Sequence, residues 1–308
     1  MSASVPPLAA MISALRRGHE GMTEKTTHVV GERADAITYD VRGDLASATP
    51  ERPVLMLIGS PMDASGFGTL AGHFTDRPVV TYDPRGSGRN PTDTAPLTPE
   101  QHAADLHRVV RALGAGPVDL FATSGGAVNA LRLVETHPDD VRRLVAHEPP
   151  TAVLLPDRDR VLGACEDIVA TYRKAGHGPA MAKFIALVMY DGELPADYLD
   201  RPAPDPAMFG MSAEDNGTRD DPLMRNFPAC QLYTPDPAAL AALGDRLFVV
   251  AGKASCETMA ARGARSVAAA VGVPVTEFAG DHGCFLGGEH GQTGEPDAFA
   301  ADLRAALA

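Results

Sequence analysis

The sequence has few of the features that mark secreted, membrane-spanning or nucleic-acid-binding proteins. It contains four cysteines in 308 residues and no CxxC pair. Neither a disulfide framework nor a zinc site is therefore expected, and reduced thiols indicate a cytoplasmic protein. Acidic residues outnumber basic ones by 40 to 27, which disfavours nucleic acid and anionic membranes as partners. No apolar run approaches the ~20 residues needed to cross a bilayer, and no motif indicates a cofactor or a metal ion.

The first 26 residues are predicted to form a separate helical segment. Its apolar side chains share one face of a helix: Leu8, Met11, Ile12 and Leu15. The basic pair Arg16-Arg17 follows this apolar stretch, whereas in a secretory signal it would come first. We therefore expect an amphipathic helix that lies on the body of the protein or on a partner subunit, an arrangement that would fit a homodimer.

Residues 27–150 and 236–308 alternate short apolar runs with helical patterns. The first stretch contains a half-exposed strand at 36–43, strands apolar on both faces at 53–60, 78–83, 117–123 and 141–148, and helices at 66–74, 98–113 and 125–137. The second contains strands at 245–252 and 274–283 and helices at 257–271 and 296–307. This alternation predicts an α/β core with a mostly parallel, doubly wound sheet.

Residues 151–235 interrupt the alternation with helical patterns and no clear strand. Because this insertion follows the sixth strand, we expect a helical cap over the carboxyl edge of the sheet, where open α/β folds bind their ligands. Its apolar residues include the run MAKFIALVMY and Met208, Phe209 and Met211. They indicate a small, largely apolar substrate, although packing of the cap onto the core would explain them equally well.

The stretch LFATSGGAVNALRL, residues 120–133, passes from an apolar strand through a small, hydroxyl-bearing turn into a helix. Such a turn can be a nucleophile elbow, which holds a serine in a strained conformation with its hydroxyl open to substrate. The residues two before and two after the serine approach each other and must be small; around Ser124 they are Ala122 and Gly126. The helix N-terminus attracts developing negative charge, so the N–H of Gly125 is predicted to be one oxyanion-hole donor.

From about residue 53 to the C-terminus, the chain resembles the α/β-hydrolase superfamily in the order of its motifs. VLMLIGSPMDASGFGTL is similar to the strand and loop that supply the second oxyanion donor, here the N–H of Ser60, although the family's usual His-Gly is Ile-Gly. YDPRGSGRN is similar to the family's structural D-x-R-G-x-G turn. HPDDVRRLVAHEPP resembles the turn and sixth strand, and EFAGDHGCF resembles the segment with the catalytic histidine, matched by His282. The resemblance implies an α/β-hydrolase fold with His282 as base; His147 competes poorly because it lies within a strand.

The triad carboxylate is harder to assign from the sequence. The commonest family position follows the seventh strand, but the matching residue is Ser255, and a serine cannot stabilise an imidazolium as a carboxylate does. Some members carry the acid at the end of the sixth strand, where this chain has Glu148. Glu148 is therefore the predicted acid, with Glu257 as the alternative. Asp281, next to His282, is expected to cap its own loop.

Three functions remain open at this point. The first is a serine hydrolase that acts on a carboxylic ester, lactone or thioester of a small apolar molecule through an acyl-enzyme on Ser124, with His282 and Glu148 completing the triad. A serine nucleophile disfavours epoxide hydrolysis and dehalogenation, which use an aspartate in this family. The second is a biosynthetic enzyme that uses the same groups for elimination, cyclisation or acyl transfer, and the third is a small-molecule-binding protein on this fold.

Overall fold

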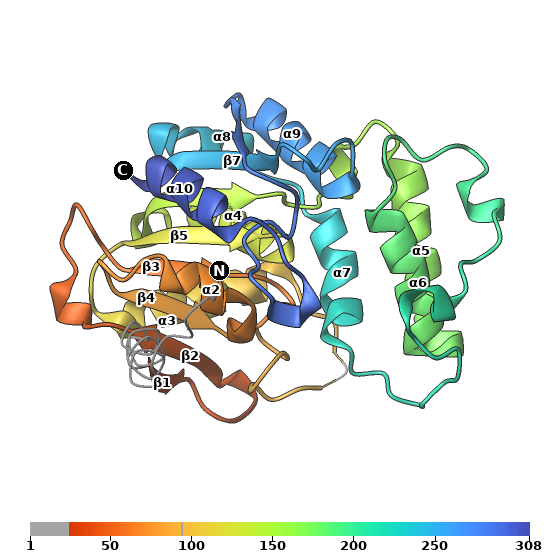
Figure 1. Ribbon diagram of the computed structural model, residues 1–308, viewed down its shortest axis with the longest axis horizontal. Coiled ribbons are helices and arrows are strands. Elements are labelled where there is room, and N and C mark those ends of the chain that lie inside the picture. The colour runs from red at the N-terminus through yellow and green to blue at the C-terminus, as the bar shows by residue number, and fades with distance from the viewer. Residues whose placement is uncertain (1–24, 94) are drawn as a thin grey trace, which may run out of the picture.

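The protein was studied as a computed structural model that describes residues 25–93 and 95–308, and its centre is an eight-stranded sheet (Figure 1). In chain order the strands are β1 Lys25–Val30, β2 Ile37–Arg42, β3 Leu55–Ile58, β4 Val79–Tyr82, β5 Val118–Thr123, β6 Val141–His147, β7 Leu247–Gly252 and β8 Val275–Phe278. The helix predicted for residues 1–26 lies outside the described residues, except that its last two residues begin β1 and are extended.

The strands are arranged in the order β1-β2-β4-β3-β5-β6-β7-β8. β2 runs antiparallel to β1 and to β4, whereas every pair from β4 to β8 is parallel. The parallel strands therefore all end at one edge of the sheet, and the loops that leave these ends are brought together there. The predicted, mostly parallel sheet is confirmed.

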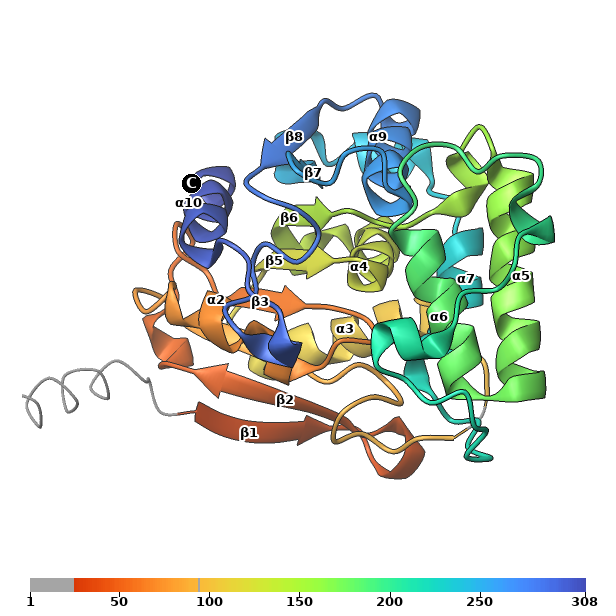
Figure 2. The ribbon, with the colours of Figure 1, turned by 45° about the vertical axis from the view of Figure 1, so that its right-hand side comes forward.

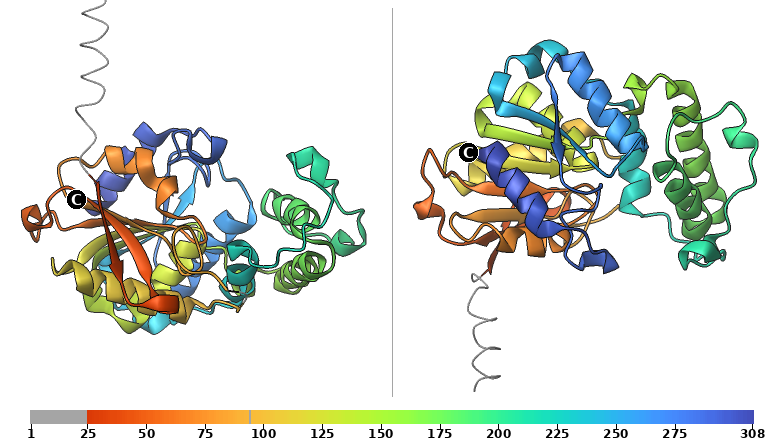
Figure 3. Two further views of the ribbon diagram at one scale, coloured as in Figure 1. Left: turned by 90° about the horizontal axis from the view of Figure 1, so that it is seen from below. Right: turned by 45° about the horizontal axis from the view of Figure 1, so that its top comes forward.

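Helices cover both faces of the sheet. In the described residues the α-helices are α2 Gly68–Gly72, α3 Pro99–Leu113, α4 Gly125–Thr136, α5 Arg158–Ala175, α6 His177–Val188, α7 Pro222–Leu232, α8 Pro237–Ala241, α9 Met259–Val271 and α10 Pro296–Leu307. Side chains of α3, α4 and α9 form the apolar core on one face, and those of α2 and α10 form it on the other. In Figure 3 (right), α10 crosses in front of the strands. In the described part of the chain, no helix combines the length and apolar character needed to span a membrane.

Of the four helices between β6 and β7 in the described chain, α5, α6 and α7 belong to the insertion. They share a separate apolar cluster that includes Ile168, Leu187 and Phe227. Figure 2 shows α6 and α7 on the side of the sheet toward which the arrow of β3 points. The end of α7 departs from this pattern, because Cys230 belongs to the main core of the sheet. Met208 does not belong to the apolar cluster either, since it is 75% exposed.

A buried ion pair fastens this insertion to the core. Asp157, just before α5, pairs with Arg262 of α9, and both side chains are almost inaccessible to solvent. Arg262 Nη1 also donates to the carbonyl of Gly192 at 2.8 Å, and Asp157 Oδ2 accepts from the N–H of Leu194 at 2.8 Å. The start of α5 and the loop after α6 are therefore both held against the helix that follows β7.

The first two strands differ from the sequence prediction. β1 was not expected, because its sequence KTTHVV is exposed along almost its whole length at the edge of the sheet and carries no apolar periodicity. The run at 36–43 was expected to be half-exposed, but Ile37–Val41 is buried because β2 lies between β1 and β4. Both errors concern this edge of the sheet, where the prediction did not include β1.

Candidate active site

Ser124 lies in the turn between β5 and α4 and has a strained backbone. Its φ of 57° and ψ of −132° fall in a region that residues other than glycine rarely adopt, at a cost on the order of 1–3 kcal/mol. Its N–H donates to the carbonyl of His147, the last residue of the neighbouring strand β6, at 2.9 Å. A partly exposed serine thus stands at the N-terminus of a helix, the geometry expected of a nucleophile elbow.

The first two residues of α4 are glycines that press against the loop after β3. A Cβ added to Gly126 would lie 2.8 Å from the Cα of Gly59, and one added to Gly125 would lie 2.6 Å from the carbonyl oxygen of Ser60. The sequence argument assigned the crowding at Gly126 to Ala122, but the three closest atoms belong to Gly59. The glycines are needed because they let the elbow approach the loop that carries Ser60.

Two backbone donors at this junction have no acceptor in the protein. Within the described residues, neither the N–H of Gly125 nor that of Ser60 donates a hydrogen bond. The N–H of Gly125 lies at the positive end of the α4 dipole. The hydroxyl of Ser60 is also buried and has no partner there. These groups are the kind of donor that a negatively charged substrate oxygen would require.

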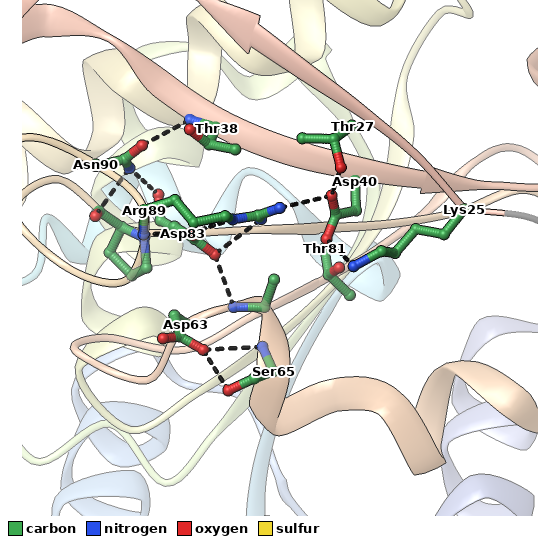
Figure 4. Close-up of polar contacts among 12 residues, drawn as sticks. Lys25, Thr27, Thr38, Asp40, Asp63, Ser65, Thr81, Asp83, Arg89 and Asn90 are labelled. Carbon is green, nitrogen blue, oxygen red and sulfur yellow. Dashed lines mark hydrogen bonds and ion pairs between the residues drawn. The ribbon is translucent and has the colours of Figure 1, made fainter.

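The D-x-R-G-x-G turn holds the loop that carries Ser60 (Figure 4). Asp83, directly after β4, accepts a hydrogen bond from the N–H of Ala64 at 3.1 Å and so joins the two loops. The same carboxylate accepts from the Arg89 N–H, Nε and Nη2 at 2.8, 2.6 and 3.1 Å. Arg89 Nη1 reaches the buried Asp40 at 2.8 Å. Burial would raise the pKa of Asp40, but its hydrogen bond with Arg89 contributes to lowering it to about 2.

Glu148 and His282 form a hydrogen-bonded pair at the carboxyl edge of the sheet. Glu148 directly follows β6, and its side chain is fully buried. Its Oε2 lies 2.6 Å from His282 Nδ1, and its Oε1 accepts from the N–H of Gly252 at 2.8 Å. Glu148 also has a positive φ of 50°, a strain that persists only where the surroundings determine the conformation. The carboxylate therefore has both oxygens bonded and faces the loop after β8.

The pKa of Glu148 is lowered to about 2. Burial, the largest single influence, disfavours the charged carboxylate, but the hydrogen bond with His282 and the electrostatic effect of the two neighbouring histidines together outweigh it. Ser255, at the commoner acid position, adds to the lowering, although its buried hydroxyl makes no hydrogen bond of standard geometry in the described residues. Glu148 is therefore ionised at neutral pH and accepts the Nδ1–H of His282, which leaves Nε2 free to take a proton.

His282 and Ser124 are linked through β6 rather than by a direct bond. Within the described residues no hydrogen bond joins the two side chains, and the His282 side chain is 44% exposed. Such bonds are often long in ligand-free enzymes and tighten when substrate binds. The carbonyl of His147 holds the N–H of Ser124, and the next residue, Glu148, holds His282. One strand end thus contacts both.

The other carboxylates considered as acids are directed elsewhere. The exposed Glu257 pairs with Arg265 Nη1 at 3.0 Å. Asp281 accepts from the N–H of Gly283 at 3.0 Å, as expected of a loop cap. Among the described residues, Glu148 is the carboxylate hydrogen-bonded to His282, and no cluster of three or more His, Cys, Asp or Glu side chains could hold a metal ion.

His147 lies closer to the site than its place in a strand indicated. Its fully buried ring stacks on that of His282, with ring centroids 5.7 Å apart and planes inclined by 23°. Its Nδ1 lies 2.9 Å from Thr123 Oγ1. Burial lowers its pKa to about 4. The one signal for this residue in the sequence was its position beside Glu148 at a strand end. The stacking could not be predicted, because it depends on how the loop after β8 folds.

The described geometry agrees with comparisons to known proteins. The model of the alpha/beta hydrolase fold family matches residues 52–246, more than half of the chain. The chain therefore belongs to the α/β-hydrolase fold family, and the resemblance and fold inferred from its motifs are confirmed.

Individual relatives match over smaller parts. The uncharacterized hydrolase YraK of Bacillus subtilis is 34% identical over 123 residues, which are 39% of this chain and 43% of YraK. The putative carbamate hydrolase RutD of Caulobacter segnis is 32% identical over 114 residues, 36% of this chain and 42% of RutD. The chain thus spans less than half the length of these curated relatives. The enol-lactonase of Burkholderia xenovorans LB400 shares the fold with a TM-score of 0.64 and 18% identity, covering 91% of this chain and 99% of that one.

Proposed function

We propose that this protein is a serine hydrolase that cleaves a carboxylic ester, lactone or thioester of a small, largely apolar molecule. The observation that carries the proposal is the 2.6 Å hydrogen bond between His282 and the buried, ionised Glu148, at the sheet edge where Ser124 occupies a strained turn. A base held by a carboxylate beside a serine in an elbow is the arrangement that activates a serine hydroxyl.

In the first half of the proposed reaction, Ser124 Oγ attacks the acyl carbon of the substrate. His282 Nε2 takes the hydroxyl proton, and Glu148 stabilises the resulting imidazolium. The negative charge moves to the former carbonyl oxygen, which the N–H groups of Gly125 and Ser60 would bind. The tetrahedral adduct then collapses, the bond to the alkoxide or thiolate breaks, and His282 returns its proton to this leaving group.

In the second half, water replaces the leaving group. His282 Nε2 removes a proton from the water, and the oxygen attacks the carbonyl carbon of the acyl-enzyme. The same donors would bind the second oxyanion. The carbon–oxygen bond to Ser124 breaks, the serine recovers its proton from His282, and the carboxylic acid leaves. The net change is the addition of one water to the acyl bond.

The apolar residues of the insertion support an apolar substrate. Met181, Phe184 and Leu223 pack against the apolar cluster of α5–α7 and are only partly buried. The cap therefore keeps some apolar surface accessible. The names of the relatives add bond types worth testing, because one is called an enol-lactonase and others putative carbamate hydrolases. A suitable panel contains short-chain p-nitrophenyl esters, a five-membered lactone, a thioester and a carbamate.

A fluorophosphonate probe tests the nucleophile without knowledge of the substrate. Attack by Ser124 on phosphorus would expel fluoride and leave a covalent adduct, which intact-protein mass spectrometry detects and peptide mapping locates. We expect one adduct on Ser124 in the wild type and none in Ser124→Ala. Labelling of another residue, or no labelling of a folded wild type, would contradict the proposal and favour a binding protein. A product that gains one water distinguishes hydrolysis from elimination or acyl transfer.

A further inference from the structure

His147 is joined to all three residues of the proposed triad. Its carbonyl accepts the N–H of Ser124, its peptide bond leads to Glu148, and its ring stacks on His282. The ring also lies among three phenylalanines, with centroid separations of 6.1 Å to Phe121, 6.5 Å to Phe285 and 5.3 Å to Phe299. The mechanism described above gives this side chain no task.

Packing alone does not explain a histidine at this position. Its Nδ1 is bonded to Thr123 Oγ1, but within the described residues its buried Nε2 has no hydrogen-bond partner. A buried polar atom without a partner is destabilising, and an apolar ring of similar size would avoid that cost. Burial lowers the pKa of His147 to about 4, so the ring is neutral at the pH at which a neutral His282 could act as a base.

The stacking geometry suits a charged neighbour. The centroid distance of 5.7 Å and the angle of 23° describe a stacked pair of nearly parallel rings, within the ~6 Å at which a cation is attracted to an aromatic ring. The hydrogen bond that His282 Nδ1 donates to Glu148 fixes one edge of the His282 ring but not its plane. The stack on His147 supplies that second constraint, while part of His282 remains open to solvent.

We propose that His147 is a positioning residue for His282: its neutral ring holds the plane of the His282 ring and stabilises the positive charge that His282 acquires. This inference rests on the function proposed above. Among the described residues, the titratable groups with a hydrogen bond or a ring contact to His282 are Glu148 and His147, both at the end of β6. Its chain neighbour Asp281 is engaged with the N–H of Gly283.

Three substitutions at position 147 separate the ring from its hydrogen bond. His147→Leu removes both, His147→Phe keeps an aromatic face, and His147→Gln keeps a polar partner for Thr123 but no ring. Phe299→Leu is the matched control, because Phe299 packs on the same His147 ring but forms no ring contact with His282. In each full-length variant, NMR follows the pH midpoint at which His282 titrates, and hydrolysis of a p-nitrophenyl ester gives kcat and KM.

We expect the His282 midpoint to fall by about half a pH unit in His147→Leu and His147→Gln, which is the shift that loss of a cation–aromatic contact would give. kcat should fall about threefold with KM unchanged, and His147→Phe should keep the wild-type midpoint. Phe299→Leu should lower the unfolding temperature and leave the midpoint unchanged. The Gln variant keeps the comparison valid if the Leu variant does not fold.

The proposal is overturned if the Leu and Gln variants titrate as the wild type does, if Phe shifts the midpoint as far as Leu, or if Phe299→Leu has the same effect. The NMR midpoint does not depend on turnover. If no variant hydrolyses any ester but the midpoint shifts as expected, the hydrolase function fails and the stacking role stands. If esters are hydrolysed but the midpoint does not move, the outcome is the reverse.

Discussion

The ends of β6 and β7 lie side by side near the proposed base, and they differ in what they offer it. β6 is followed by Glu148, a fully buried carboxylate with one oxygen on His282 and the other on the N–H of Gly252. β7 is followed by Ser255, whose buried hydroxyl has no partner in the described residues, and by Glu257, which is exposed and paired with Arg265.

Under the proposed mechanism, the acid lies one strand away from the commoner position while the base keeps its place. β6 and β7 are parallel neighbours, so their carboxyl ends lie close to the same loop after β8. A carboxylate at either end can bond the same imidazole. Here β7 contributes a donor instead of an acid, because Gly252, its last residue, gives its N–H to Glu148. Burial keeps the Glu148 carboxylate away from water and competing cations, whereas His282 remains partly exposed.

The largest effect is expected at the nucleophile, because the groups at the ends of β6 and β7 would act through it. Ser124→Ala should keep the fold and lower kcat for a p-nitrophenyl ester by about 10⁶, the loss seen when the nucleophile of a serine triad is removed. Ser266→Ala is the matched control, because Ser266 lies in the middle of α9. Circular dichroism checks the fold of both. Activity of Ser124→Ala within tenfold of the wild type would remove Ser124 from the mechanism.

Replacing Glu148 tests the difference between the ends of β6 and β7 most directly. Glu148→Gln should cost about 10⁴ in kcat, because an amide cannot stabilise the imidazolium and favours the wrong tautomer of His282. Glu257→Gln removes a carboxylate of the same size from the end of β7 and should leave kcat near the wild-type value. The opposite ranking would place the acid after β7, and two fully active variants would mean a Ser–His dyad.

The two strand ends should also differ in how they respond to acid. The pKa of Glu148 is about 2 in the folded protein, against the ordinary glutamate value of 4.5. A depressed pKa stabilises the fold above pH 4.5, on the order of 3 kcal/mol, and this stability is lost as the pH falls from 4.5 towards 2. In urea unfolding, the advantage of the wild type over Glu148→Gln should therefore shrink between pH 6 and pH 3. A constant difference would show that folding does not lower the pKa of Glu148.

A smaller effect is expected when the acid is moved back to β7. Ser255→Asp in the Glu148→Gln background places a carboxylate where the wider family keeps one, next to the same histidine. We expect a recovery of about tenfold in kcat over the single Glu148→Gln variant, equivalent to ~1.4 kcal/mol of transition-state stabilisation. Ser255→Asn, which adds the same bulk without the charge, is the control and should give no recovery. Equal recovery by both would show that packing rather than charge was restored.

Features that depend on local sequence could be predicted. The strand–turn–helix around Ser124 could be read because a short apolar run, small residues and a helical pattern follow one another directly. Glu148 could be singled out because the strand 141–148 ends in it and the usual acid position holds a serine. In the structure Glu148 is hydrogen-bonded to the predicted base, 134 residues away in the chain.

Features that depend on packing between distant segments could not be predicted from the sequence. The polar β1 has no apolar periodicity, so its pairing with β2 was missed. Gly126 was correctly expected to need little space, but the segment that crowds it, Gly59, is far away in the sequence. His147 was set aside because a strand position says nothing of the ring that will stack on it. That stack forms only when the loop after β8 folds over β6.

The rate of fluorophosphonate labelling in the wild type, Glu148→Gln and Glu257→Gln is the most direct test of the Ser124–His282–Glu148 assembly, because it requires no knowledge of the substrate. Intact-protein mass spectrometry gives the second-order rate constant for the adduct on Ser124 in each protein. We expect the wild type and Glu257→Gln to label at the same rate, and Glu148→Gln to label orders of magnitude more slowly, towards the ~10⁴-fold loss seen when the triad acid becomes an amide. Equal rates in the wild type and Glu148→Gln, or a slow Glu257→Gln, would contradict the assignment of the acid to the end of β6.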